Sequence, residues 1–213
     1  MRVGLRGAML VAQLPAPHRC LSSAVLGGGL GWLRTWVNLG VPAGYGRTDP
    51  ADHLAAEAAG LADPVVGMLT AVDVSTYTRG DHGVASALAT VGVRHALAPA
   101  GTRPRTVPPA GTINLLVVVG EPLTDAGLAG ALQTAVEAKA QALADAGVAA
   151  DNAAGWATGT ATDSLCVACP PGSRAEFAGP ATAAGSSLAR AVHAAVLTGA
   201  VAERKQAAPG RAA

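Results

Sequence analysis

The segment that most limits the possible folds is an apolar run followed directly by a helical pattern, TINLLVVVGEPLTDAGLAGALQTAVEAKAQALADAG. The run from 113 to 119 is rich in β-branched residues and carries no charge, which predicts a buried strand. Thr124 can cap the helix that follows, Asp125 suits its positive end, and Gly147 can terminate it. The chain should therefore form a sheet with a long helix packed on it.

The N-terminal region alternates with the period of β-strands. The segments RVGLRGAMLVAQL and HRCLSSAVL predict two strands joined by a turn at the Pro-Ala-Pro sequence of residues 15–17. WLRTWVNLGV predicts a third strand, with Trp32, Arg34, Trp36 and Asn38 on one face. The glycine-rich stretch 27–31 suits a hairpin bend before it. This third of the chain is expected to be an antiparallel meander.

The remaining segments mix helical and strand signals. Asp49 and Pro50 mark a helix start, and PVVGMLTAV predicts a buried strand. A short helix is expected near 83–90, a strand near 93–98, and a surface loop over the Pro- and Gly-rich segment 98–111. A last helix is expected from Gly179 and Pro180 to about Gly199.

Together these patterns predict the α+β class: a mixed β-sheet with an N-terminal antiparallel meander and alanine-rich helices packed on it. Residues 1–200 are expected to form a single domain, followed by a disordered tail at 201–213. Because aromatic residues make up only 3% of the chain, its core must be built from Ala, Val and Leu.

Charge and cysteine content restrict the partners and the compartment. A net charge of +1 argues against a nucleic-acid partner, and no apolar run is long enough for a membrane span. The apolar run 8–12 is too short for a secretion signal. Three cysteines, an odd count, fit reduced thiols and a cytoplasmic location. The sequence leaves the oligomeric state open, a homo-oligomer included.

One lysine interrupts the apolar stripe of the long helix. At about 100° per residue, Lys139 falls in the middle of a stripe formed by Leu128, Leu132, Val136 and Leu143. In the simpler interpretation its side chain extends along this face until the amine reaches water. In the alternative, Lys139 pairs with a carboxylate at the sheet, because a buried cation needs such a partner. Asp163 and Asp73 are then the candidates, with hydroxyls of Thr160, Thr162 or Ser164 nearby.

The signals for a metal or cofactor are weak. Cys166 and Cys169 form a lone CxxC, and strand alternation would place the two thiols on opposite faces. We therefore interpret them as buried structural thiols and expect neither a metal nor a cofactor.

The turn GTATDS, residues 159–164, matches no recognised nucleotide-binding loop. Its backbone N–H groups could bind an anion or an oxyanion, although an ordinary hydroxyl-rich turn would have the same composition. The strand face with Trp32, Trp36 and Asn38 could bind a flat ligand or simply pack against a helix.

Several segments, in chain order, resemble the adenosylcobinamide amidohydrolase family. They are LSSAVLGGGL, VNLGVP, VGMLTAVDV, TINLLVVVGEPLTDAGLAGALQTAVEAKAQAL, GWATGTATDSLCVACP and AGPATAAGSSLARAVHAAV. The resemblance runs from Leu21 to Val196, and its most specific pieces are the TIN strand, the EAKAQAL helix and ATGTATDS. It implies an enzyme of corrinoid salvage, which hydrolyses the amide between the aminopropanol arm and the corrin ring of adenosylcobinamide to give adenosylcobyric acid. The corrinoid is then the small-molecule substrate, not a cofactor.

The resemblance implies no particular catalytic residue, but the chemistry of amide hydrolysis indicates which residues could form the site. That reaction needs a nucleophile or activated water, a stabilised oxyanion and a proton for the leaving amine. Lys139 is expected to act as base or as amine-protonating acid, and Asp163 to orient it or activate water. Thr160 or Thr162 would supply the nucleophile or an oxyanion donor, and Glu137 is the alternative general base.

Substrate contacts are expected from a further set of residues near the same turn and from the N-terminal strand face. They are Asn114, Asn38, Trp156, Gly159 and Ser164. Two other functions stay open at this point: a non-catalytic corrinoid-binding module and an amidase of unrelated specificity.

Overall fold

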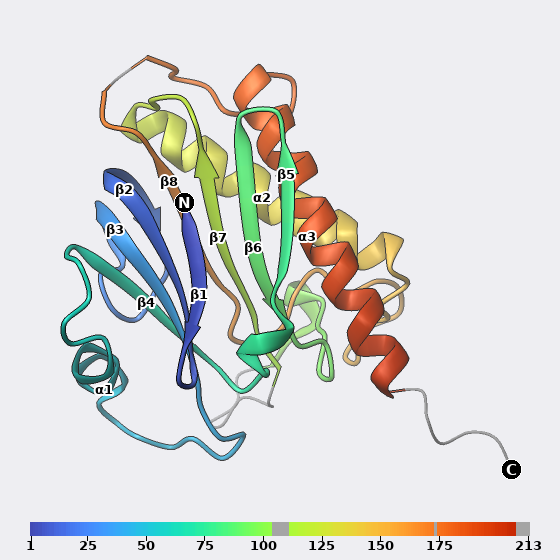
Figure 1. Cartoon of the computed structure of the whole chain (residues 1–213). Helices are drawn as coiled ribbons and strands as arrows, with labels where there is room; N and C mark the ends of the chain where they lie inside the picture. The colour runs from blue at the N-terminus through green and yellow to red at the C-terminus, as the bar shows by residue number, and fades with distance from the viewer. Residues whose placement is uncertain (104–110, 173, 208–213) are drawn as a thin grey trace, which may run out of the picture.

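The computed structural model describes residues 1–103, 111–172 and 174–207, and these residues form an α+β fold (Figure 1). Strands β1 to β8 span Arg2–Arg6, Met9–Ser22, Gly29–Gly40, Val65–Thr70, Thr78–His82, Ala85–Val91, Ile113–Val119 and Ser164–Cys169. They form one mixed sheet in the order β4-β3-β2-β8-β7-β6-β5, and β1 pairs with the first half of β2. The pairs β3–β4 and β7–β8 are parallel. No helix of the described residues is long and apolar enough to cross a membrane.

Two long helices, α2 (Asp125–Asp145) and α3 (Ala183–Ala207), cover one face of the β5–β8 half of the sheet (Figure 1). The core between these helices and the sheet is built largely from alanine and valine, as the low aromatic content requires. Small residues allow close approach: a Cβ atom on Gly80 of β5 would overlap the carbonyl oxygen of Ala191 on α3. The helix signals of α2 are also confirmed, because the Thr124 hydroxyl accepts the Gly127 N–H at 3.0 Å and Gly147 follows with a φ of +68°.

The other half of the sheet curls until β4 comes back against β7. The Asn114 side chain of β7 donates to the Leu69 carbonyl of β4 at 2.9 Å across this junction. The curled strands enclose a second core that includes Trp36, Met68 and Leu116. The short helix α1 (Pro50–Glu57) covers the outside of β3 and β4 with Leu54.

The N-terminal strands differ from the sequence prediction in one respect. The first hairpin turns at Gly7, whereas the Pro-Ala-Pro sequence lies inside β2. The β2–β3 pairing breaks between the pairs Gln13–Thr35 and His18–Leu33, so the prolines make a bulge. Proline has no N–H to donate, and it is therefore tolerated where a strand pair is interrupted.

This bulge also overturns the expected grouping of side chains on β3. Leu33 and Trp36 both belong to the inner core, so the alternation changes phase between them. Trp32 pairs directly with Arg19, whose guanidinium lies 5.8 Å from the indole ring centre. Trp32 and Trp36 therefore do not share one face.

Three predictions in the rest of the chain need correction. Residues expected to form a short helix near 83–90 form the strand β6 instead, because their small and β-branched side chains pack between β5 and β7. The segment 93–98 is irregular, with a single bridge from Leu97 to Gly159. The helix α3 continues to Ala207, so the first part of the expected tail is helical, and residues 208–213 lie outside the described residues. Residues 104–110 of the loop predicted at 98–111 also lie outside them.

Candidate active site

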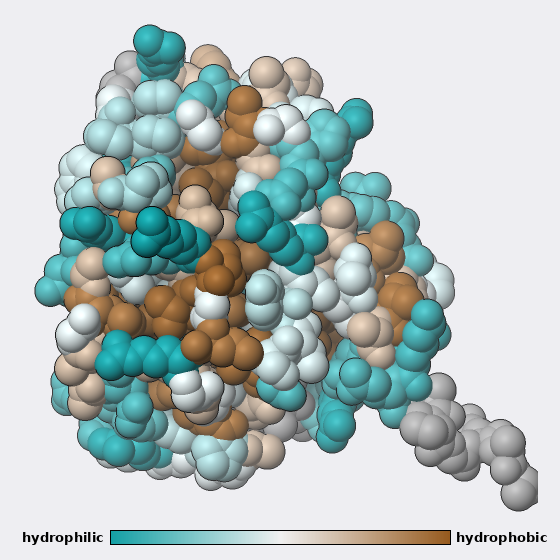
Figure 2. All heavy atoms as spheres, in the orientation of Figure 1, coloured by the Kyte–Doolittle hydropathy of each residue, from teal (hydrophilic) through white to brown (hydrophobic). Residues whose placement is uncertain are grey.

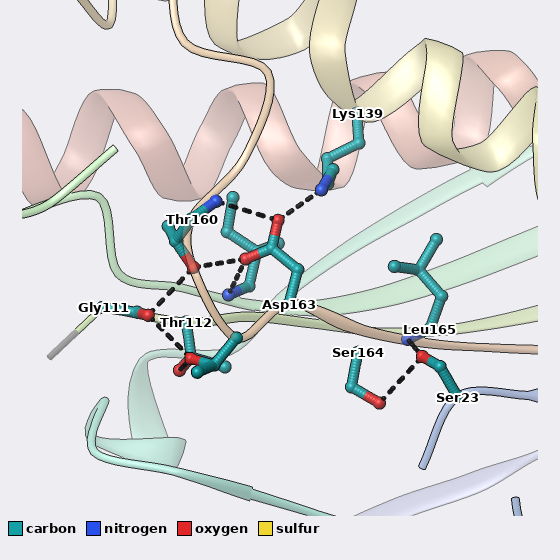
Figure 3. Close-up of polar contacts among 10 residues, drawn as sticks. Ser23, Gly111, Thr112, Lys139, Thr160, Asp163, Ser164 and Leu165 are labelled. Carbon is teal, nitrogen blue, oxygen red and sulfur yellow. Dashed lines mark hydrogen bonds and ion pairs between the residues drawn. The ribbon is translucent and has the colours of Figure 1, made fainter. Parts of the chain in front are cut away.

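Lys139 and Asp163 form an ion pair beneath helix α2 (Figure 3). Lys139 extends from α2, and Asp163 ends the turn that leads into β8. Their side chains are only 7% and 9% exposed, so both charges are largely removed from water. The interpretation of Lys139 as a paired lysine is confirmed. Asp73 is not its partner, because that carboxylate caps a 3₁₀ turn by accepting the Ser75 N–H at 2.9 Å, which lowers the pKa of Asp73.

The Asp163 carboxylate receives hydrogen bonds on both oxygens. Oδ1 accepts from the Ile113 backbone N–H at 3.0 Å and from the Thr160 hydroxyl at 2.5 Å. Oδ2 accepts from the Thr160 backbone N–H at 3.1 Å and from Lys139 Nζ. These bonds connect the turn to α2 and to β7, and they hold the carboxylate in one orientation. They also occupy the Thr160 N–H, which is therefore not free to stabilise an oxyanion.

Gly159 makes room for this cluster. A Cβ atom at this position would overlap Asp163 Oδ2 and would lie 2.6 Å from Lys139 Nζ. The residue is fixed in place by its carbonyl oxygen, which accepts the Leu97 N–H at 2.8 Å. The glycine is therefore required by close approach, and its contribution is space for the ion pair.

The hydroxyl of Thr160 lies between two acceptors. Besides Asp163, the Gly111 carbonyl oxygen lies 2.9 Å from Thr160 Oγ1. One hydroxyl has one proton, so it can donate to only one of them at a time. Thr162 of the same turn is exposed, with its hydroxyl 2.7 Å from that of Thr112 and 3.1 Å from the Gly111 carbonyl oxygen.

The two asparagines predicted to contact substrate lie elsewhere. Asn114 Nδ2 donates to Asn38 Oδ1 at 2.8 Å, and Asn38 Nδ2 donates to Thr90 at 2.8 Å. All three side chains are completely buried inside the curled half of the sheet. Successive residues of a strand point to opposite faces, so Asn114 points away from the helices although its neighbour Ile113 contacts Asp163.

Three other candidates lie outside the cluster. The Ser164 hydroxyl lies 3.3 Å from that of Ser23, the residue that follows β2 (Figure 3). Trp156 is 57% exposed, at the start of the segment that carries the turn. Glu137 is exposed on the far side of α2, where it accepts a hydrogen bond from Gln133. Since α2 presents the Lys139 side to the turn, Glu137 lies apart from the cluster.

The prediction from sequence missed the strand side of the site. Gly111, Thr112 and the Ile113 N–H contact the turn although they lie about fifty residues before it in the chain. No spacing pattern marks these residues, because two of the contacts use backbone atoms. Only the parallel pairing of β7 with β8 brings them beside the turn.

A cleft of about 240 Å³ borders the site on this side. Gly111 and Thr112 form part of its wall, together with Asp73, Arg94 and Glu203 from other segments. Within the described residues, no group of three or more His, Cys, Asp or Glu side chains is placed to hold a metal ion. Cys166 and Cys169 are buried in the two different cores, as the strand alternation predicted.

The chain belongs to a family of amidohydrolases, enzymes that hydrolyse amide bonds. The family is the adenosylcobinamide amidohydrolase family, whose model matches residues 1–208. This match confirms the resemblance noted in the sequence. A search of curated proteins finds no match to the chain.

Proposed function

We propose that the protein hydrolyses the amide that joins the aminopropanol arm to the corrin ring of adenosylcobinamide, giving adenosylcobyric acid. The family supplies the reaction class, and the cluster of Lys139, Asp163 and Thr160 is the observation that carries the proposal. It brings together a hydroxyl, a carboxylate and an ammonium in hydrogen-bonding contact. These are the groups that a nucleophilic amide hydrolysis uses.

In the proposed first step, Thr160 Oγ1 attacks the amide carbonyl carbon and its proton passes to Asp163 Oδ1, 2.5 Å away. The C–N bond then breaks, and Lys139 donates a proton to the departing amine. Because Lys139 contacts Asp163, the proton taken from Thr160 can return to the lysine. Water then hydrolyses the threonyl ester, which releases the corrinoid carboxylic acid and restores the hydroxyl.

The size of the neighbouring cleft fits a small part of the substrate. At about 240 Å³ it lies below the usual range for drug-sized ligands, roughly 300–1,000 Å³. A corrin ring must therefore stay outside it, while the aminopropanol arm can enter beside Thr112. The Asp73 carboxylate in its wall suits the cationic amine that leaves after hydrolysis, whereas Glu203 in the same wall already pairs with Arg94 at 3.6 Å. The substrate is the only small molecule in this proposal, and no cofactor takes part.

The test is a chromatographic assay for cobyric acid released from adenosylcobinamide. Wild-type protein should release it, whereas Asp163→Asn and Thr160→Val should lose at least a hundredfold in kcat. Thr160→Ser should keep most of the activity, because it retains the hydroxyl. Arg79→Gln is the matched control, since it breaks an exposed ion pair, Arg79–Asp81, away from the cluster. This pair lies on the edge strand β5, which β6 separates from β7.

The other outcomes separate the remaining functions. Binding of the corrinoid without release of cobyric acid would identify a non-catalytic module. Release of amines from simple amides but not from adenosylcobinamide would identify an amidase of different specificity. Full turnover in Thr160→Val with none in Asp163→Asn would exclude the threonine as nucleophile and leave activated water.

A further inference from the structure

A second cleft lies where the prolines of β2 interrupt its pairing with β3. It has a volume of about 410 Å³ and is lined by Met1, Arg2, Gln13, Leu14, Pro15 and Arg34. None of these residues belongs to the candidate active site or to the cleft beside it. Figure 2 shows hydrophobic side chains gathered on this face near β1, with hydrophilic side chains on either side.

The bulge explains why this cleft exists. The residues 14–17 of β2 stand opposite Arg34 alone on β3, so neither strand can fill the gap with a regular ladder. On the other side, β1 places Arg2 directly opposite Gln13. Two guanidinium groups and one amide therefore converge on a hollow whose lining contains no carboxylate.

Arg34 lacks the partners that a charge in this position needs. Its side chain is half-buried, and its Nε atom is buried with no hydrogen-bond partner in the described residues. Neither Arg34 nor Arg2 takes part in any ion pair of the described residues. By contrast, Arg19, Arg47 and Arg79 each pair with an aspartate. A buried guanidinium donor without an acceptor is costly and calls for an explanation.

We propose that this cleft is a binding site for a small molecule bearing an oxyanion, a carboxylate or a phosphate. The planar guanidinium of Arg34 is suited to two parallel hydrogen bonds with such a group. Arg2 adds a second positive charge, and Gln13 adds an amide donor. Leu14 and Pro15 give the cleft an apolar wall for the rest of the ligand. This site is independent of the proposed hydrolysis.

Thermal unfolding and calorimetric titration with inorganic phosphate and with acetate test the site, at constant ionic strength set with sodium chloride. Wild-type protein should show a saturable rise in Tm with at least one of the two anions that chloride does not produce. Arg34→Gln should bind that anion at least tenfold more weakly. Arg190→Gln, which removes a charge from the exposed side of α3, should bind like wild type.

The two anions distinguish the sources of the oxyanion. Saturation by phosphate alone identifies a phosphate ligand, and saturation by acetate identifies a carboxylate. If Arg34→Gln does not fold, then Arg34→Lys and Arg2→Gln carry the test, each with weaker binding expected. The proposal is overturned if wild-type protein binds neither anion, or if loss of the Arg34 guanidinium leaves the affinity unchanged.

Discussion

At the scale of single residues, the site depends on how a buried lysine is neutralised. A charge removed from water must be paired and hydrogen-bonded, or the folded state pays a large desolvation cost. Lys139 meets this condition through Asp163, and Asp163 in turn is held by Thr160 and by the Ile113 N–H. The same contacts that neutralise the lysine therefore also orient the proposed nucleophile.

Gly159→Ala tests the space that this pair requires. The new methyl group would overlap the Asp163 carboxylate, which its four hydrogen bonds prevent from moving freely. We expect a loss of about 1–3 kcal/mol in the free energy of unfolding, measured by urea denaturation, together with a fall in kcat.

Gly155→Ala is unsuitable as the control for that experiment, because Gly155 has a φ of +103°. Gly4→Ala is suitable, since a Cβ atom on Gly4 meets nothing within 4 Å. Equal stability of the Gly159 and Gly4 variants would contradict the assigned close approach.

At the scale of elements, strand β8 connects the two large cores. Cys166 faces the core inside the curled sheet, and Cys169 faces the core under the helices. The Cys20 thiol contacts Cys166, and this contact together with burial raises the pKa of Cys166. Burial also raises the pKa of Cys169. Both thiols of β8 are therefore protonated packing groups, as their place in a buried strand predicts.

The raised pKa of Cys169 predicts an alkaline loss of stability. The folded state holds this proton more tightly than the unfolded chain, in which a cysteine has a pKa of about 8.5. The contribution to stability is complete below that value and is lost as the pH rises through the folded pKa. The unfolding free energy, measured in urea at pH 7.5 and pH 10, should therefore fall less in Cys169→Ala than in wild-type protein. An equal fall in both would contradict burial of the thiol.

At the scale of the whole molecule, the curl of the sheet decides which polar residues can reach a substrate. It brings β4 against β7 and closes Asn38, Thr90 and Asn114 into one buried network. Trp36 and Met68 fill the core around them. The helices on the opposite face leave the Lys139 cluster beside the turn before β8. Two neighbours in sequence therefore have different roles: Asn114 belongs to the buried network, and the Ile113 N–H binds Asp163 of the cluster.

Asn114→Ala distinguishes a structural role from substrate binding. The change leaves the side chain of Asn38 and the carbonyl of Leu69 without a buried donor. We expect a loss of about 2–3 kcal/mol in the free energy of unfolding, since each unsatisfied group costs roughly 1–3 kcal/mol. The KM for adenosylcobinamide, measured on the folded fraction, should stay at the wild-type value. A raised KM with unchanged stability would restore Asn114 to the substrate-binding set.

The sequence by itself determined the features that depend on neighbouring residues. Strand β7, helix α2 with its cap at Thr124, and the presence of Lys139 on the buried side of α2 all follow from local periodicity and capping. The α+β class follows from the succession of these patterns. Local signals failed where the small residues of β6 resemble a helix, and where the prolines of β2 suggested a turn.

Only the tertiary structure decided the partners. Charge alone leaves both Asp163 and Asp73 as possible partners of Lys139, and only the fold shows that the turn carrying Asp163 reaches the helix. Gly111 and Thr112 join the site because the parallel pairing of β7 and β8 aligns the starts of both strands. The unpaired guanidinium of Arg34 likewise results from a bulge on another strand. Such contacts depend on strand order and sheet curvature, which act between residues far apart in the chain and leave no periodic trace in the sequence.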